Sequence, residues 1–140
     1  FNLLTVEDVC VHDGRVVGLV ANRSLVGDAL PVDPITFSAQ AVLDTTGHEA
    51  VVVAALRRRG LPPLAESVDV GEGPMNARAG ETFVVERVCE LHPGLWVAGM
   101  SVCAALGGAR MGPIFGGMLL SGQRAAERIA EALAKPSDES

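Results

Sequence analysis

Two apolar stretches rich in β-branched residues, 3–11 and 16–21, open the chain. The polar sequence His12-Asp13-Gly14-Arg15 separates them. Apolar runs on either side of an Asp-Gly pair are typical of two antiparallel strands joined by a tight turn. The pattern therefore predicts a β-hairpin at the start of the chain.

A strand is predicted next, over 35–43, where the sequence ends in the apolar run Ala41-Val42-Leu43. A rigid corner precedes this strand. The corner is Pro31-Val32-Asp33-Pro34, where two prolines fix φ and bias the residues before them toward extended conformations. A loop over 44–48 follows the strand. Apolar residues at helical spacing and a basic last turn then predict a helix over 49–59.

The second half of the chain begins with a stretch rich in proline, glycine and acidic residues, 61–80, which predicts a surface excursion. Alternating apolar residues predict a strand over 81–91, and a short buried strand is predicted over 95–98. Glycine-rich residues 101–117 predict a loop. Apolar residues recur every four positions over 119–133 and predict a helix.

This order of elements predicts an α/β fold with an antiparallel β-hairpin part. A complete dinucleotide-binding domain begins with a strand, a glycine-rich turn and a helix, and no G-x-G-x-x-G follows a strand in this sequence. Half of any nucleotide site would therefore lie elsewhere. The polar residues 137–140 are expected to form a frayed tail.

Composition narrows the class of protein. The chain has 140 residues, of which 49% are hydrophobic and 20% charged, with a net charge of −6, as expected for one folded domain. The excess of acidic residues disfavours electrostatic binding to nucleic acid, and no apolar run approaches the ~18 residues of a membrane span. Residues 1–10 lack the basic region of a signal peptide, so we expect a cytoplasmic protein.

The cysteines and two of the histidines predict little chemistry. Cys10, Cys89 and Cys103 are odd in number and far apart, which indicates neither a disulfide framework nor a structural zinc site. We expect them to be buried as small hydrophobic residues. His12 and His92 stand in turn sequences and are expected at the surface.

His48 and Asp33 are stronger candidates. His48 follows the predicted strand 35–43 at its carboxyl end, where open α/β sheets place their ligands. Asp33 lies in the proline corner, which leaves its carboxylate little conformational freedom to lose. Such a pair suits Fe(II) or a similar ion if the two meet in space. Asp44 lies nearby, and we interpret it as a cap of the loop or the following helix.

Arg110 lies in an apolar, glycine-rich segment with no acidic residue close in sequence. Its planar guanidinium suits bidentate binding of a carboxylate or phosphate. A buried structural ion pair with a distant acidic residue is the alternative. Met100 and Met111 are expected to be apolar lining.

Several sequence runs together resemble the thiazole synthase family of thiamine biosynthesis. The most specific are P-G-L-W-V-A-G-M at 93–100 and A-R-M-G-P-I-F-G-G-M-L-L-S-G at 109–122. Shorter matches follow the same order at 6–9, 32–35, 43–50 and 73–75. The resemblance implies a dinucleotide-binding, Rossmann-like fold of the FAD/NAD(P) type, with residues 1–140 as the C-terminal portion of a single domain.

The resemblance also implies an activity. Members of the family form an adenylated thiazole carboxylate from NAD, glycine and sulfur, with NAD as a substrate. Eukaryotic-type members take the sulfur from a cysteine two residues before the aspartate of the D-P pair, whereas archaeal-type members carry histidine there and use free sulfide with Fe(II). This chain has Pro31 at that position. The expectation is therefore the sulfide-dependent, archaeal-type ADP-thiazole synthase, a transferase of the pentosyl type.

Site residues follow from the resemblance position by position. Asp33 and His48 match the iron ligands, which adjacent subunits contribute, and Arg110 matches the residue that binds the glycine carboxylate. The positions that match NAD-binding residues are Val6, Pro31, Val32, Asp33 and Met100. The resemblance implies a homo-oligomer, with an octamer as the suggested form, whose partners are NAD, glycine and sulfide rather than nucleic acid or membrane.

Two other functions stay open. An FAD- or NAD-linked oxidoreductase fragment of the same superfamily would also carry the strand end at 94–100. An inactive fragment or degenerate paralogue would account for Pro31 and for the nucleotide loop that this sequence lacks. The resemblance to the thiazole synthase family further leads us to expect that the chain is the back half of a larger domain, inactive alone, with Phe1 not its natural start.

Overall fold

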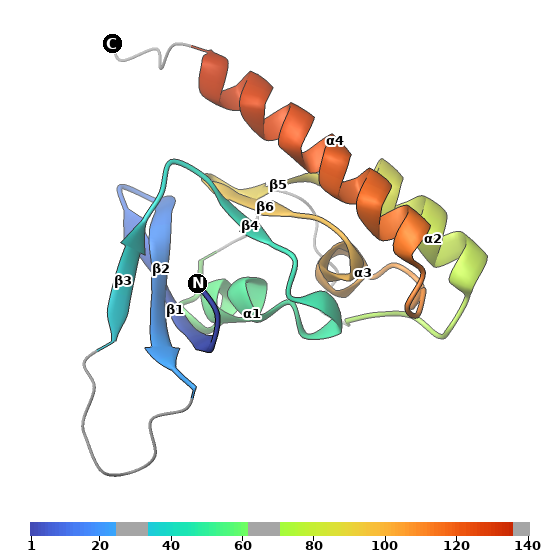
Figure 1. The fold of residues 1–140 in the computed structure, drawn as a ribbon, viewed down its shortest axis with the longest axis horizontal. Coiled ribbons are helices and arrows are strands. Elements are labelled where there is room, and N and C mark those ends of the chain that lie inside the picture. Colours follow the sequence, from blue (N-terminus) through green and yellow to red (C-terminus); the bar gives the residue numbers. More distant parts are fainter. Residues whose placement is uncertain (25–33, 62–70, 136–140) are drawn as a thin grey trace.

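The computed structural model describes residues 1–24, 34–61 and 71–135. It is a mixed α/β structure with two three-stranded sheets (Figure 1). The first sheet is antiparallel, in the order β1-β2-β3, with β1 at Leu4–His12, β2 at Arg15–Arg23 and β3 at Ile35–Ser38. The α/β class expected from the sequence is confirmed.

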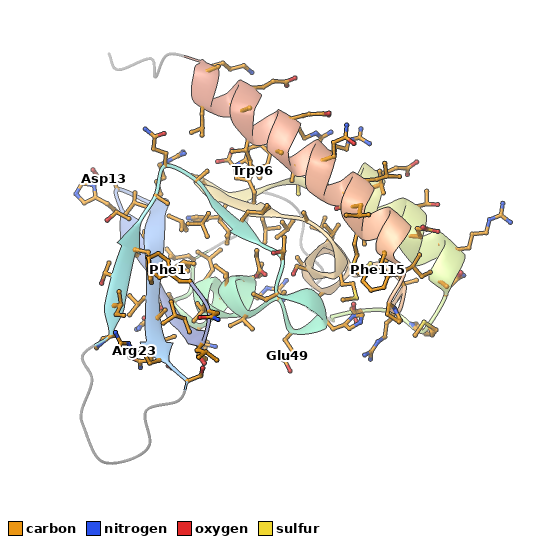
Figure 2. All side chains as sticks on the ribbon, in the orientation of Figure 1. Phe1, Asp13, Arg23, Glu49, Trp96 and Phe115 are labelled. Carbon is orange, nitrogen blue, oxygen red and sulfur yellow. The ribbon has the colours of Figure 1, made fainter. Side chains whose placement is uncertain are left out.

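The predicted hairpin is the pair β1 and β2. His12 pairs with Arg15 across a two-residue turn, and Asp13 and Gly14 have φ values of 48° and 74°. Positive φ at both central residues is the requirement of a type I′ turn, which matches the twist of the flanking strands. Asp13 and Arg23 consequently lie at opposite ends of the hairpin (Figure 2).

The second sheet has the order β4-β6-β5, with β4 at Val42–Asp44, β5 at Cys89–His92 and β6 at Leu95–Val97. β4 is parallel to β6, and β5 is antiparallel to it. All three residues of β6 are buried, as expected for a central strand covered on both faces. The short buried strand predicted over 95–98 is confirmed.

The single strand predicted over 35–43 is wrong, because the chain changes sheets within it. β3 ends at Ser38 in the first sheet and β4 starts at Val42 in the second. The Arg15 guanidinium donates to the Gln40 carbonyl at 3.0 Å in the crossing segment. The residues at the crossing, Ser38, Ala39 and Gln40, are exposed. None of them is a glycine or proline that would mark a bend in the sequence.

The two sheets meet closely at Gly94. The Val16 amide donates to the Pro93 carbonyl at 2.8 Å, and a Cβ on Gly94 would lie 2.1 Å from the Val16 carbonyl oxygen. The φ of Gly94 is 79°, in the region that only glycine adopts without cost. A glycine at this position is what allows the two sheets to approach.

Helices cover the second sheet. A short 3₁₀ turn (Gly47–Glu49) leads into α1 (Val51–Arg58), while α4 (Phe115–Ala134) runs across the sheet beside α2 (Ala77–Glu86) (Figure 1). α1 confirms the helix predicted over 49–59, and α4 confirms and extends the one predicted over 119–133. Residues of the basic end of α1 reach β1: Arg58 donates to the Glu7 carbonyl at 3.1 Å, and Arg59 pairs with Asp8.

The strand predicted over 81–91 is wrong for most of its length. Residues up to Glu86 belong to α2, and only the end of the range lies in β5. The Asn76 side chain accepts a hydrogen bond from the Ala79 amide at 3.1 Å and caps the helix. Gly80 and Val84, four positions apart, are the buried residues of this helix. The apolar residues in this range fit the period of a helix as well as that of a strand, so their alternation does not distinguish the two.

The loop predicted over 101–117 is also wrong in part, because Met100–Leu106 forms α3. Residues 101–106 are all buried. A short helix that is buried on every side has no amphipathic pattern to recognise. His92 is a second correction: it lies in β5 with 5% of its surface exposed, not in an exposed turn.

Some predictions fall outside the described residues. These are the ones on Pro31, Val32 and Asp33, on 62–70 within the surface excursion 61–80, and on the tail 137–140. The end of the excursion is described: 77–80 form the first turn of α2. Within the described ranges, no helix is both long and apolar enough to cross a membrane.

Candidate functional site

A groove of about 640 Å³ contains two of the side chains singled out from the sequence, His48 and Arg110. They come from distant parts of the chain, the 3₁₀ turn after β4 and the segment after α3. Its other lining residues are Glu72, Gly73, Pro74, Met75, Gly112 and Pro113. The fold therefore brings an imidazole and a guanidinium to one surface.

The turn that carries His48 is built around the buried carboxylate of Asp44, the last residue of β4. Its Oδ2 accepts hydrogen bonds from the Val52 and Val53 amides, both at 3.0 Å. Its Oδ1 accepts from the Thr46 amide at 2.9 Å and from the Thr46 hydroxyl at 2.7 Å. Asp44 thus caps the first turn of α1 and folds the preceding loop, which confirms the cap interpretation.

Ser101 of α3 ties the same loop to the helix behind it. Its hydroxyl oxygen lies 3.1 Å from Asp44 Oδ1 and 3.2 Å from the Gly47 carbonyl oxygen, and it accepts the Gly47 amide at 3.1 Å. Ser101 and Asp44 are both fully buried. Ser101 therefore holds Gly47, the residue directly before His48, against α3.

Glu72 and Arg110 are placed by a separate backbone ladder. The Gly73 amide donates to the Gly108 carbonyl at 2.9 Å, and the Arg110 amide donates back to the Gly73 carbonyl at 3.2 Å. The Asn76 amide then donates to the Arg110 carbonyl at 3.0 Å. These bonds form a short parallel bridge that sets the two charged residues side by side.

The carboxylate of Glu72 lies between the two predicted residues. Its Oε1 is 2.5 Å from Nδ1 of His48, and its Oε2 is 3.9 Å from Nε of Arg110. The side chains of Glu72, His48 and Arg110 are 11%, 26% and 52% exposed. The acidic partner is thus the least exposed member, and the guanidinium is open to a ligand in the groove.

Glu72 was missed from the sequence. It stands between Gly71 and Gly73 in a range interpreted as a surface excursion, and this Gly-x-Gly does not follow a predicted strand, so the sequence assigns Glu72 no role. An acidic residue flanked by glycines, beside a segment with a motif match, was the available signal. Arg110 does have a distant acidic partner in Glu72, but its guanidinium is half-exposed, so the pair is not the buried structural ion pair of the alternative interpretation.

Two other predicted site residues, Met100 and Val6, do not line the groove. Met100 begins α3 and is half-buried, and its methyl carbon would lie 3.6 Å from a Cβ on Gly47, beside the histidine loop. Val6 is half-buried in β1 and packs against the core. A second hollow, of about 560 Å³, is lined largely by the chain start and the first sheet, and Arg23 is its one charged side chain among the described residues.

One side chain in the groove, His48, is oriented as a metal ligand would be. Across residues 1–24, 34–61 and 71–135, no three His, Cys, Asp or Glu side chains gather as a metal cluster. His48, however, has its Nδ1 against a carboxylate, which is the usual outer support of a metal-binding imidazole. Its Nε2 is the atom that this arrangement leaves for a metal. Further ligands would have to come from elsewhere, and Asp33 lies outside the described ranges.

Two of the three cysteines, Cys89 and Cys103, are poor nucleophiles in the folded protein. All three are free. Burial, with a smaller effect of the nearby Glu72 charge, raises the pKa of the Cys103 thiol to about 11. Burial likewise raises the pKa of Cys89. Both remain protonated at neutral pH, and a protonated thiol is a poor nucleophile.

Comparisons with known proteins agree on one family. The family model described as "Thi4 family" matches residues 1–115. A thiamine thiazole synthase of Thermotoga maritima is 52% identical over 134 residues, covering 95% of this chain and 52% of that protein. One from Thermococcus kodakarensis is 48% identical over 136 residues, covering 96% and 53%.

A solved structure shows the same fold. The crystal structure of Thermovibrio ammonificans THI4 superposes with a TM-score of 0.87 at 43% identity, covering 96% of this chain and 54% of that one. The chain thus spans about half the length of the relatives that it matches.

Proposed function

The chain belongs to the Thi4 family, and from this premise we propose that the protein acts in thiamine thiazole biosynthesis. The proposed reaction forms ADP-thiazole carboxylate from NAD, glycine and sulfide in the presence of Fe(II). We propose further that residues 1–140 are the C-terminal portion of a single dinucleotide-binding, Rossmann-like domain. The sequence identity to thiamine thiazole synthases over nearly the whole chain supports this reaction over a hydride-transferring oxidoreductase.

The observation that carries the proposal is the arrangement of His48, Glu72 and Arg110 in one groove. A carboxylate-supported imidazole suits a divalent metal, and an exposed guanidinium suits the carboxylate of an amino acid. An amino acid that binds close to a metal ion needs a metal-binding imidazole and a carboxylate-binding guanidinium within its own length. The groove brings them together.

Each residue has a proposed role in this reaction. His48 and Asp33 would hold the iron, with adjacent subunits of a homo-oligomer contributing them. When bound, the metal supplies a Lewis acid and a template for the substrates. Arg110 binds and orients the glycine carboxylate. Met100 lies beside the histidine loop, and it is proposed to contact NAD together with Val6, Pro31, Val32 and Asp33.

Free sulfide is the proposed sulfur source. The position two residues before Asp33 is Pro31, which carries no sulfur. Cys103 and Cys89 are protonated at neutral pH because burial raises the pKa of each thiol. Pro31 and these two protonated thiols therefore support a reaction that consumes free sulfide as a substrate.

The test uses the full-length protein that contains this chain. It is incubated without oxygen with NAD, glycine, sulfide and Fe(II), and the products are analysed by mass spectrometry. We expect an adenylated thiazole carboxylate that disappears when sulfide or glycine is omitted and in His48→Ala. Absence of this product with all four components present contradicts the proposal, and formation of reduced nicotinamide instead would favour the oxidoreductase.

A further inference from the structure

We propose that Glu72 is a positioning residue that fixes the tautomer and orientation of His48, and so presents Nε2 of the imidazole to a ligand in the groove. The inference deepens the proposed function and rests on it for the identity of that ligand. The tautomer itself is a property of this chain alone. It can be measured whether or not the protein makes a thiazole.

The contact between the two side chains determines where the hydrogen sits. Nδ1 of His48 is 2.5 Å from Oε1 of Glu72. An ionised carboxylate can only accept hydrogen bonds, so Nδ1 must carry the hydrogen. In the neutral imidazole the lone pair is then on Nε2, the nitrogen that remains to bind a metal ion or a substrate proton.

Backbone hydrogen bonds of the neighbouring residue fix the position of Glu72. Gly73, the next residue, donates to Gly108 and accepts from Arg110. With an exposed fraction of 11%, the Glu72 side chain is also held by its surroundings. The carboxylate is therefore a fixed reference against which the imidazole of His48 is aligned.

The same carboxylate also lies close to Arg110. Its other oxygen is 3.9 Å from Nε of Arg110, which leaves the guanidinium attracted to one side of the groove. Removing the carboxylate would therefore free the imidazole of His48 and the guanidinium of Arg110 to rotate at the same time. Glu72 thus links the orientation of His48 to that of Arg110.

The first test is a nitrogen NMR measurement of the imidazole tautomers. Long-range proton–nitrogen spectra of ¹⁵N-histidine-labelled full-length protein are recorded at about pH 8, where an ordinary imidazole is neutral, and the His48→Ala spectrum identifies the His48 signals. We expect the Nδ1–H tautomer in the wild type and in Glu72→Gln, which keeps an acceptor oxygen. Glu72→Ala should shift His48 toward the Nε2–H form that free histidine favours.

A matched control is Glu49→Ala. Glu49 is the residue next to His48, and its exposed side chain points away from the body of the molecule (Figure 2). It should leave the His48 tautomer unchanged. An Nε2–H tautomer in the wild type, or an unchanged tautomer in Glu72→Ala with a native circular dichroism spectrum, overturns the proposal.

The second test asks whether the alignment matters for a metal. Co(II), a spectroscopic substitute for Fe(II), is titrated into the full-length protein and followed by its visible absorption. Loss of an outer-shell carboxylate typically weakens metal binding by about 10- to 100-fold, and we expect this for Glu72→Ala but not for Glu49→Ala. A shifted tautomer with unchanged Co(II) affinity would overturn the role of Glu72 in presenting Nε2, whether or not thiazole formation is observed.

Discussion

The carboxylate of Asp44 lies 3.1 Å from the hydroxyl oxygen of Ser101, although 57 positions separate the two residues in the sequence. Both side chains are fully buried. The pair joins the end of β4 to α3 directly beneath the loop that carries His48. The geometry of the groove therefore depends on a buried network that does not itself face the groove.

Replacing Asp44 by alanine should destabilise the protein strongly. The change leaves the buried amides of Val52 and Val53 without their acceptor, whereas the Ser101 hydroxyl can still donate to the Gly47 carbonyl. Each unsatisfied buried donor costs about 1–3 kcal/mol, so we expect the free energy of unfolding to fall by at least ~2 kcal/mol. Urea denaturation followed by circular dichroism measures the loss. A fall of less than ~1 kcal/mol would contradict the role of the network.

Asp44→Asn is the sharper variant of the same experiment. It keeps the size of the side chain but replaces one acceptor oxygen by an NH₂ group, which would face either the two helix amides or the Thr46 donors. We expect a loss of about 2 kcal/mol. Glu86→Ala, at the exposed end of α2, serves as the control and should stay within about 0.5 kcal/mol of the wild type.

Replacing Arg110 by lysine should weaken the use of glycine selectively. Lysine keeps the charge but loses the planar, bidentate donor geometry. The loss of one charge-assisted hydrogen bond, about 1.5 kcal/mol, corresponds to a KM for glycine raised by about tenfold, with the KM for NAD unchanged. Steady-state kinetics of the full-length enzyme, with Arg78→Lys on the exposed face of α2 as the control, makes the comparison. Equal glycine dependence in the two variants would remove Arg110 from the substrate site.

Replacing Gly94 by alanine should prevent the close approach of the two sheets. The new Cβ would meet the Val16 carbonyl oxygen at 2.1 Å, at a backbone φ of 79°. We expect a loss of more than about 2 kcal/mol in the free energy of unfolding. Gly122→Ala is the counterpart within α4, where a Cβ meets nothing within 4 Å, and it should gain about 0.5–1 kcal/mol. Equal effects of the two changes on the urea midpoint would contradict this packing.

The Cys103 thiol should make stability fall at alkaline pH. Its pKa is raised to about 11 in the folded protein, mainly by burial, from an ordinary value of 9.0. The folded state therefore holds the thiol proton more tightly than the unfolded state. This contribution is fully present below about pH 9 and is lost as the pH rises toward 11. Urea denaturation between pH 8 and pH 11 should show a steeper decline for the wild type than for Cys103→Ala, and parallel curves would contradict it.

Local patterns in the sequence were sufficient for some elements. The Asp13-Gly14 turn and the four-residue repeat of α4 each contain their own structural signal, so the hairpin and the last helix could be predicted. α2 and α3 could not, because a short apolar segment fits two periodicities and a fully buried helix shows none. In both cases packing against the rest of the fold decides the structure.

Some residues of the candidate site could likewise be predicted from the sequence, and others could not. His48 could be selected because it follows a buried strand, and Arg110 because it is a lone charge in an apolar segment. Glu72 could not, since only the bridge between Gly73 and Ala109 brings it to these two residues. Asp33, Pro31 and Val32 stay predictions, and so does the use of iron.

The parallel pairing of β4 with β6 has a kinetic consequence. Val42 pairs with Leu95, so a long loop must close before this ladder can form, and contacts between residues far apart in sequence slow folding. His48 is attached to one of these strands and Arg110 follows the other. The β1–β2 hairpin can form early from local contacts, whereas the groove needs this long-range pairing. A refolding chain should therefore regain the hairpin before it regains any capacity to bind a ligand.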